Sequence, residues 1–148
     1  KVKVLDTSCF IKTTEKGEVL IDPLHKKIQN AVAKLIKNDY VHPYVETGLS
    51  DAEGQRVDIK GIFKETGEWH YFEIKTDSAK KSIREALGQI LEYAHYPNMR
   101  RATKLFIVGP LQPDDKDAAY MEFIRKTYAI PVWFRWYSFE QNKLYDGI

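Results

Sequence analysis

The chain of 148 residues is long enough to bury one core, and 43% of its residues are hydrophobic, so we expect a single domain over residues 1–148. A net charge of +2 does not by itself indicate nucleic acid, so any basic surface must be local. The sequence has no apolar run of about eighteen residues, which excludes a membrane-spanning helix. Cys9 is the one cysteine, which excludes an internal disulfide, and we expect a cytoplasmic protein with no membrane partner.

In chain order, the first expected element is a short strand within Lys1–Ile11. Asp22 and Pro23 then predict the start of a helix, because Asp caps helices and Pro fits the first helical position. The helix is expected over Leu24–Lys37, with apolar residues at helical spacing, namely Leu24, Ile28, Ala31, Val32, Leu35 and Ile36.

Two polar residues of this helix, His25 and Gln29, lie one turn apart at the margin of the apolar stripe. They are either a surface or half-buried polar pair or part of a site, and helix spacing alone leaves this open. The next strand is expected over Tyr40–Thr47, followed by a polar loop over Gly48–Gln55. Near the end of that strand, Glu46 is either a solvated acid or a further carboxylate of a site.

The stretch Val57–Thr76 alternates like two strands joined by a tight turn. A four-residue turn places Asp58 opposite Lys75, and a turn two residues longer places Asp58 opposite Glu73. Either register keeps the apolar side chains on one face and gathers Asp58, Glu73 and Lys75 on the other. Two carboxylates beside an ammonium form a small cation site with a fixed positive group, which is chemistry that suits phosphodiester cleavage.

A second helix is predicted over Ser78–Tyr96, with an apolar stripe formed by Ile83, Ala86, Leu87, Ile90, Leu91 and Ala94. Gln89 and Tyr93 are four residues apart and therefore share a face of this helix. We expect Gly88 where the helix lies close to a strand, because glycine is unfavourable in a helix interior. The first turns carry a basic cluster that is either a solvated face or a phosphate contact, formed by Lys80, Lys81 and Arg84.

The last third of the chain predicts a buried strand, a helix and a final strand. The buried strand is expected over Lys104–Gly109, and a helix capped by Asp114 or Asp115 follows. We expect this helix to face the core with Tyr120, Phe123, Ile124 and Tyr128. The final strand, Val132–Phe139, is rich in aromatic residues, which either cover a small core or stack on bases.

Asp58, followed by Glu73-Ile74-Lys75, resembles the motif of the PD-(D/E)xK nuclease superfamily. The segment from Gln89 to Tyr93 resembles the QxxxY motif of its RecB-type and archaeal Holliday-junction-resolvase-like branches. The resemblance covers roughly Leu24 to Val108. It implies an α/β fold with a restriction-endonuclease-like αβββαβ core, in which helices flank a central mixed sheet. The predicted elements after that core form an added C-terminal αβ unit.

The resemblance also implies an activity and a cofactor, namely a nuclease that depends on Mg²⁺ or Mn²⁺. Asp58 and Glu73 would be metal ligands, together with the backbone carbonyl of Ile74. Lys75 would orient the attacking water or contact the scissile phosphate. The implied partner is nucleic acid, with DNA expected, held in part by the basic cluster of the second helix. Many members of the superfamily dimerise, so the alternatives for this chain are a homodimer or a domain of a larger protein.

The remaining roles follow from the same resemblance. Gln89 would fix Lys75, the water or the phosphate, and Tyr93 would support these groups from behind. Many members carry a further acid on the first helix, and this chain has no acid between Asp22 and Asp39. His25 or Gln29 is a candidate for that place, and Glu46 for a further carboxylate.

Three alternatives to a nuclease are open at this point. Without the helix acid, the chain could be a nucleic-acid-binding module that keeps the fold but does not cleave. Asp58, Glu73 and Lys75 could instead neutralise one another as a structural salt bridge on an exposed sheet, in which case no pocket would lie there. A metal-dependent hydrolase of another phosphodiester is the third alternative.

Overall fold

A computed structural model describes residues 11–14, 17–20, 22–45, 57–96 and 101–148. Its centre is a six-stranded mixed sheet in the order β3-β4-β5-β6-β7-β8, and a separate two-stranded sheet joins β1 and β2. The strands are β1 Ile11–Thr14, β2 Gly17–Leu20, β3 Tyr40–Val45, β4 Ile59–Phe63, β5 Trp69–Ile74, β6 Lys104–Gly109, β7 Val132–Ser138 and β8 Lys143–Leu144. The helices are α1 Pro23–Ile36, α2 Ala79–His95 and α3 Asp115–Tyr128.

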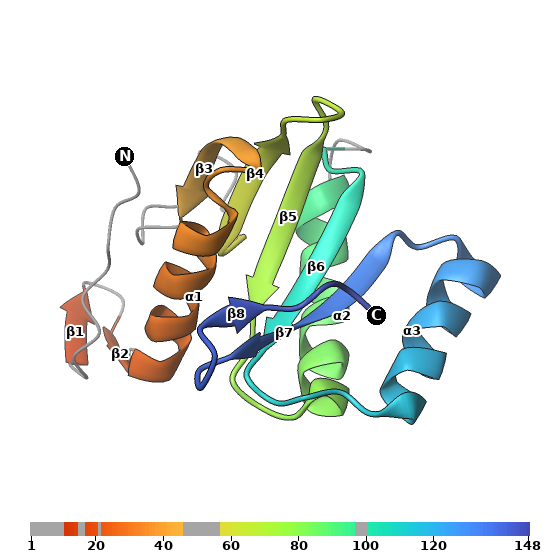
Figure 1. Ribbon diagram of the computed structural model, residues 1–148. Helices are drawn as coiled ribbons and strands as arrows, with labels where there is room; N and C mark the ends of the chain where they lie inside the picture. The colour runs from red at the N-terminus through yellow and green to blue at the C-terminus, as the bar shows by residue number, and fades with distance from the viewer. Residues whose placement is uncertain (1–10, 15–16, 21, 46–56, 97–100) are drawn as a thin grey trace.

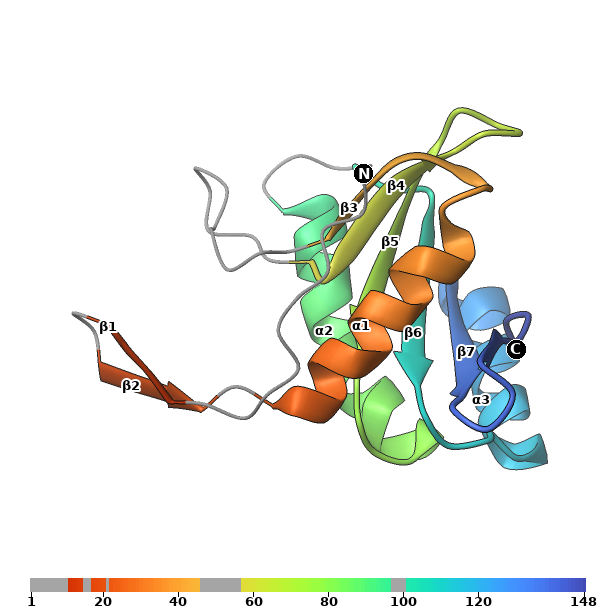
Figure 2. The same cartoon turned by 60° about the vertical axis from the view of Figure 1, so that its left-hand side comes forward.

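The helices lie on both faces of the sheet (Figures 1 and 2). On one face α1 packs through Ile28 and Val32 against Ile59 and Phe72. On the other face the core contains apolar side chains from α2, α3, β6 and β7, namely Ile83, Ala86, Ile90, Leu105, Ile107, Met121, Ile124 and Phe134. The α/β class, with a central mixed sheet flanked by helices, is therefore confirmed.

From α1 onward, the described elements follow the order predicted from the sequence, and β8 adds a short edge strand. The expected strand within Lys1–Ile11 falls almost wholly outside the described residues, as do Glu46 and the loop Gly48–Gln55. Within the described ranges, no helix combines the length and apolar character needed to cross a membrane.

Side-chain caps fix where the helices begin. The carboxylate of Asp22 accepts a hydrogen bond from the backbone N–H of Leu24 at 2.9 Å, and Pro23 occupies the first helical position. Ser78 caps α2 by accepting from the N–H of Lys81. At α3, Asp114 is the cap and exchanges side-chain and backbone hydrogen bonds with Asp117.

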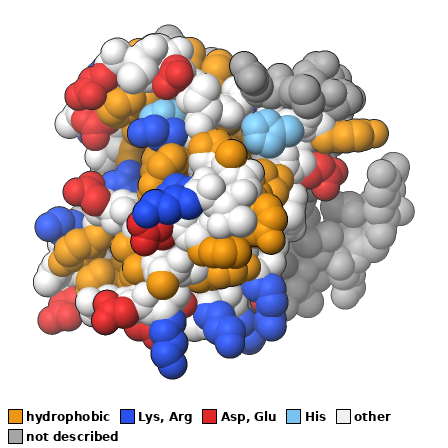
Figure 3. Space-filling view, turned by 90° about the vertical axis from the view of Figure 1, so that its right-hand side faces the viewer, with side chains coloured by type: hydrophobic (Ala, Val, Ile, Leu, Met, Phe, Trp, Pro, Cys, Tyr) orange, Lys and Arg blue, Asp and Glu red, His pale blue; other side chains and the backbone are white. Residues whose placement is uncertain are grey.

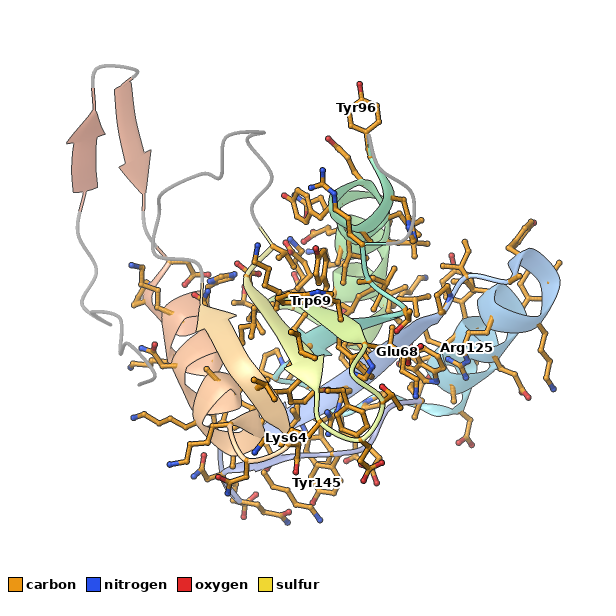
Figure 4. The ribbon with its side chains drawn as sticks, turned by 90° about the horizontal axis from the view of Figure 1, so that it is seen from above. Lys64, Glu68, Trp69, Tyr96, Arg125 and Tyr145 are labelled. Carbon is orange, nitrogen blue, oxygen red and sulfur yellow. The ribbon has the colours of Figure 1, made fainter. Side chains whose placement is uncertain are left out.

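The register of β4 and β5 is the one that the longer turn predicts. Ile59 pairs with Phe72 and Ile62 with Trp69, so the next position places Asp58 opposite Glu73. Figure 4 shows Lys64 and Glu68 in the connecting turn. This register decides between the two alternatives that the sequence left open.

Two expectations about helix faces are wrong. In α3 only Met121 and Ile124 are buried, Ile124 as predicted, whereas Tyr120, Phe123 and Tyr128 are 49%, 51% and 64% exposed. Figure 3, which views the side of the molecule where α3 lies, shows hydrophobic side chains at the surface. The helix packs mainly on β7 near one side of the sheet, so only one narrow ridge of side chains reaches the core. In α2, Gly88 is exposed, and a Cβ atom there would meet nothing within 4 Å, so no close approach explains this glycine.

Candidate active site

The carboxylate of Asp58 is fixed at the end of β5. Asp58 lies at the bend before β4, and its Oδ2 accepts a hydrogen bond of 2.7 Å from the backbone N–H of Ile74. This N–H is a donor in a largely buried environment, and such groups are rarely left without an acceptor. The side chain of Asp58 is therefore held by the backbone of the neighbouring strand beside the Glu73–Lys75 segment.

Two side chains of α1 also contact Asp58. His25 Nε2 lies 3.1 Å from Asp58 Oδ2, and Gln29 Nε2 donates to the backbone carbonyl of Asp58 at 2.8 Å. Gln29 is buried and His25 is partly exposed, so the two residues form a half-buried pair, and both contact Asp58. The first turns of α1 thus bring His25 and Gln29 to the place where the two carboxylates lie.

The charge of Asp58 also acts on His25. Burial lowers the pKa of the imidazole, but the hydrogen bond to Asp58 and the negative charges of Asp58 and Glu73 outweigh burial. The pKa of His25 is therefore raised above its ordinary value of 6.5, and the imidazolium form is favoured beside Asp58.

Glu73 is the most constrained group of the site. It is 5% exposed, and its Oε1 accepts a hydrogen bond of 3.1 Å from Lys75 Nζ. Burial, together with the charge of Asp58, raises the pKa of Glu73 to about 7, although Lys75 and His25 act in the opposite direction. The folded chain therefore brings a second carboxylate next to Asp58 at a substantial electrostatic cost.

One oxygen of Glu73 has no hydrogen-bond partner among the described residues. Among the described residues, the buried side-chain atoms without a hydrogen bond are Glu73 Oε2 and His70 Nε2. For His70 the cost is the smaller of the two, because burial lowers its pKa to about 4 and the ring is neutral. A buried carboxylate oxygen without a hydrogen-bond donor is less favourable than a neutral ring nitrogen without a partner. Glu73 Oε2 is therefore the stronger candidate for binding a ligand.

Lys75 joins the strand to α2. Its ammonium donates to Glu73 Oε1 at 3.1 Å and to Gln89 Oε1 at 2.7 Å. The buried residues Ile83, Ala86 and Ile90 fix which side of α2 packs on the sheet, and this orientation places Gln89 beside Lys75. The amide thus points toward the predicted triad.

The other candidate residues lie further out. Tyr93, one turn after Gln89, is partly buried against the core on the α2 side of the sheet. Lys81 forms an exposed ion pair of 2.9 Å with Asp77, while Lys80 and Arg84 are exposed on the first turns of α2. The structure therefore assembles the groups predicted for catalysis and leaves the basic cluster at the solvent surface.

The donor set fits a hydrated divalent cation rather than a closed protein cage. In the described part of the chain, no group of three or more His, Cys, Asp and Glu side chains is arranged to hold a metal. Mg²⁺ commonly uses one or two carboxylates and keeps several waters. Asp58 and Glu73 Oε2, which has no partner among the described residues, supply the two carboxylates of that pattern.

Comparison of the chain with protein-family models, curated proteins and solved structures finds no match. The chemistry of Asp58, Glu73, Lys75 and Gln89 is therefore the basis for assigning a function.

Proposed function

We propose that this chain is a metal-dependent nuclease of the PD-(D/E)xK type. In this proposal α1 to β6 form the restriction-endonuclease-like αβββαβ core, and α3 with β7 is the added αβ unit. The observation that carries the proposal is the buried Glu73 carboxylate, which lies next to Asp58 and keeps one oxygen without a partner among the described residues. A divalent cation between the two carboxylates would satisfy that oxygen and balance both charges.

The ligands in this proposal are the carboxylates of Asp58 and Glu73 and the backbone carbonyl of Ile74, with Mg²⁺ or Mn²⁺ as the ion. When bound, such an ion lowers the pKa of a coordinated water and neutralises the charge that builds up on the phosphate. Asp58 is already held for this role, because its Oδ2 is fixed by the N–H of Ile74.

Lys75 supplies the positive group of the reaction. An ammonium has three donors, and Lys75 uses one on Glu73 and one on Gln89. The third donor is left to orient the attacking water or to contact the scissile phosphate. Gln89 acts through Lys75, because its amide oxygen determines where the ammonium points.

His25 and Gln29 take the place of the acid that the first helix lacks. Gln29 fixes the backbone of Asp58, and His25 lies against the same carboxylate. The imidazolium balances Asp58 in the chain without metal. Loss of that proton would free Nε2 to act as a ligand beside Asp58.

A structural salt bridge on an exposed sheet fits the geometry less well. The side chains of Asp58, Glu73 and Lys75 are 14%, 6% and 18% exposed, so the three groups are largely buried. Burying charged groups in one place carries a desolvation cost, and an apolar cluster would be as stable. Retaining them here favours a role in binding or chemistry.

A nucleic-acid-binding module that does not cleave is the second candidate. The observation that favours it is that each carboxylate already has a protein partner, His25 for Asp58 and Lys75 for Glu73. With a pKa of about 7, Glu73 is also partly protonated at neutral pH, which weakens its hold on a cation.

Cleavage assays separate the two candidates. The wild-type chain is incubated with single- and double-stranded DNA and RNA in Mg²⁺, Mn²⁺ or EDTA. We expect cleavage with either metal, none in EDTA, and none by Asp58→Asn, which can still accept the hydrogen bond from Ile74. Asp115→Asn, which changes an exposed acid on α3, is the matched control and should cleave normally. Binding without cleavage under every metal condition would instead establish the binding module.

A further inference from the structure

A hollow of about 430 Å³ lies beside α1, on a face of the helix different from that of His25 and Gln29. Its other wall is the end of β7 and the turn that leads to β8, and α1 contacts β8 (Figure 1). The lining residues are Lys27, Asn30, Ala31, Lys34, Leu35, Tyr137, Phe139 and Asn142. We refer to this feature as the α1–Phe139 hollow.

The aromatic wall of the hollow is held rigidly and has a free surface. Phe139 is 46% exposed, and its ring meets that of Tyr137 edge to face, with centroids 4.9 Å apart. Tyr137 is buried, and its hydroxyl donates to Asn142 Oδ1 at 3.0 Å. The amide NH₂ of Asn142 is therefore left as a donor near the ring. A fixed aromatic surface beside an amide donor is suited to a flat, polar ring such as a nucleobase.

The charge of the hollow is positive. Lys27 and Lys34 are seven residues apart on α1, which is about 10 Å along the helix axis. No Asp or Glu is among the lining residues, and Glu140, the residue after Phe139, is exposed outside the lining. Two ammonium groups on the helix wall, together with an aromatic ring on the other wall, favour a polyanion with flat apolar rings.

We propose that the α1–Phe139 hollow binds single-stranded nucleic acid, with one unpaired base stacked on Phe139 and the neighbouring phosphates contacting Lys27 and Lys34. A duplex does not suit the hollow, because its bases are stacked on one another and present no free face. Single-stranded binding grooves combine stacking rings with cations in this way.

The hollow and the candidate active site share α1, on different faces of the helix. Lys27 is two residues from His25, so one helix carries residues of both features. This inference deepens the proposed function by naming the substrate as single-stranded, and it rests on that function for the statement that the bound strand is the one cut. Binding itself is tested without cleavage.

The test measures binding in EDTA by fluorescence anisotropy. The probes are a labelled oligothymidine of about 16 nucleotides, the upper end of single-strand site sizes, and a blunt duplex of equal length. We expect wild type to bind the single strand more tightly than the duplex, and Phe139→Ala to raise the Kd about tenfold. The double variant Lys27→Ala/Lys34→Ala should make the slope of log Kd against log salt shallower by about 1.4.

Matched controls lie on α3. Phe123→Ala removes an aromatic side chain that is 51% exposed, and Lys116→Ala/Lys126→Ala removes two exposed ammonium groups. Both should bind like wild type. Thermal melting verifies that every variant is folded. If Phe139→Ala is not folded, the salt dependence of binding by Lys27→Ala/Lys34→Ala tests the inference instead.

Two results would overturn the inference: duplex bound as tightly as single strand, or wild-type binding by both hollow variants. Cleavage by wild type in Mg²⁺ is measured in parallel. If wild type cleaves and the variants bind like wild type, binding of single-stranded nucleic acid in the hollow is rejected and the proposed nuclease activity stands. Weakened binding by the variants, with no cleavage by wild type, supports the hollow and rejects the nuclease.

Discussion

Gln89 Oε1 accepts a hydrogen bond of 2.7 Å from Lys75 Nζ, and this contact ties the middle of α2 to the end of β5. Without it, Glu73, at 3.1 Å, would be the one remaining hydrogen-bond partner of the ammonium within the described part of the chain. A long flexible side chain with one partner has several rotamers available, whereas two partners select one of them. The position of Lys75 in the site therefore depends on a residue from a different element.

Gln89→Ala should lower the rate of cleavage about 100-fold, because misplacing a catalytic group by about 1 Å has an effect of that size. The melting temperature should change little, since Gln89 is exposed. Single-turnover cleavage and thermal melting are the measurements. Gln112→Ala, at an exposed position before α3, is the control. Equal rates for Gln89→Ala and wild type would remove Gln89 from the site.

Glu73 should make the chain less stable as the pH rises in the absence of metal. Its pKa is about 7 in the folded chain and 4.5 ordinarily, so between these values the unfolded chain loses the proton first. The folded state then binds more protons, and the free energy of unfolding falls as the pH rises from about 4.5 through about 7. Urea unfolding in EDTA across this range measures the effect.

Glu73→Gln isolates this contribution, because His25 also loses its proton as the pH rises. The variant should show a weaker fall in stability in EDTA than wild type. Mg²⁺ should raise the melting temperature of wild type more at pH 8 than at pH 5.5, since the carboxylate is then ionised, and should not raise that of Glu73→Gln. Glu85→Gln, an exposed change on α2, serves as control. Equal stabilisation of wild type and Glu73→Gln by Mg²⁺ would exclude Glu73 as a ligand.

His25 should stabilise the chain mainly at low pH. Its pKa is raised in the folded state, so the contribution is complete below the ordinary value of 6.5 and is lost as the pH rises through the folded value. His25→Ala should therefore cost about 1 kcal/mol at pH 5.5, the size of one charge-assisted hydrogen bond that is partly exposed, and less at pH 8.5. Urea unfolding at the two pH values tests this, and a cost independent of pH would contradict the His25–Asp58 ion pair.

His25→Glu would test whether His25 occupies the position of the acid that many superfamily members carry on the first helix. A third carboxylate beside Asp58 should destabilise the chain in EDTA, because like charges would then lie together. If His25 occupies the position of the acid, Mg²⁺ should raise the melting temperature of this variant more than that of wild type. An equal or smaller rise would place the acid elsewhere.

Local periodicity predicts much of the sheet and of the site. Alternation over Val57–Thr76 places Glu73 on the face opposite Phe72, because side chains on a strand alternate whatever the tertiary context. It does not give the register, which depends on the length of the turn between the two strands. Helical spacing likewise predicts which side of the second helix packs on the sheet, and therefore that Gln89 projects toward the triad. In the structure Gln89 accepts a hydrogen bond from Lys75.

Contacts made over long sequence separations could not be predicted in this way. Gln29 binds the backbone of Asp58, 29 residues away, and this contact depends on how α1 docks on the sheet. The α1–Phe139 hollow has the same origin, since it joins α1 to a turn near the other end of the chain. On α3 the prediction holds for Ile124 but not for Tyr120 and Phe123, because these aromatic residues also occur in cores and only packing distinguishes them from Ile124.

Lys75 separates the catalytic and structural interpretations most sharply. If its charge only balances the carboxylates, Lys75→Ala leaves like charges together, raises the pKa of Glu73 further and lowers stability. If Mg²⁺ neutralises the two carboxylates instead, Lys75→Ala should remain folded in the presence of Mg²⁺ and should still bind metal and nucleic acid. Its cleavage should fall by about 100- to 1,000-fold, since a positioned charge at the transition state is worth about 2.7–4 kcal/mol.

Lys75→Arg distinguishes charge from geometry. A salt bridge to Glu73 would accept the guanidinium, which pairs well with carboxylates. The site described here needs a compact ammonium that reaches Glu73 and Gln89 and keeps a third donor, and a planar fork cannot reproduce that arrangement. We therefore expect Lys75→Arg to be folded, to bind substrate in anisotropy assays and to be inactive in cleavage assays. Full cleavage by this variant would show that charge alone is sufficient at position 75, and Lys75 would then have no specific catalytic role.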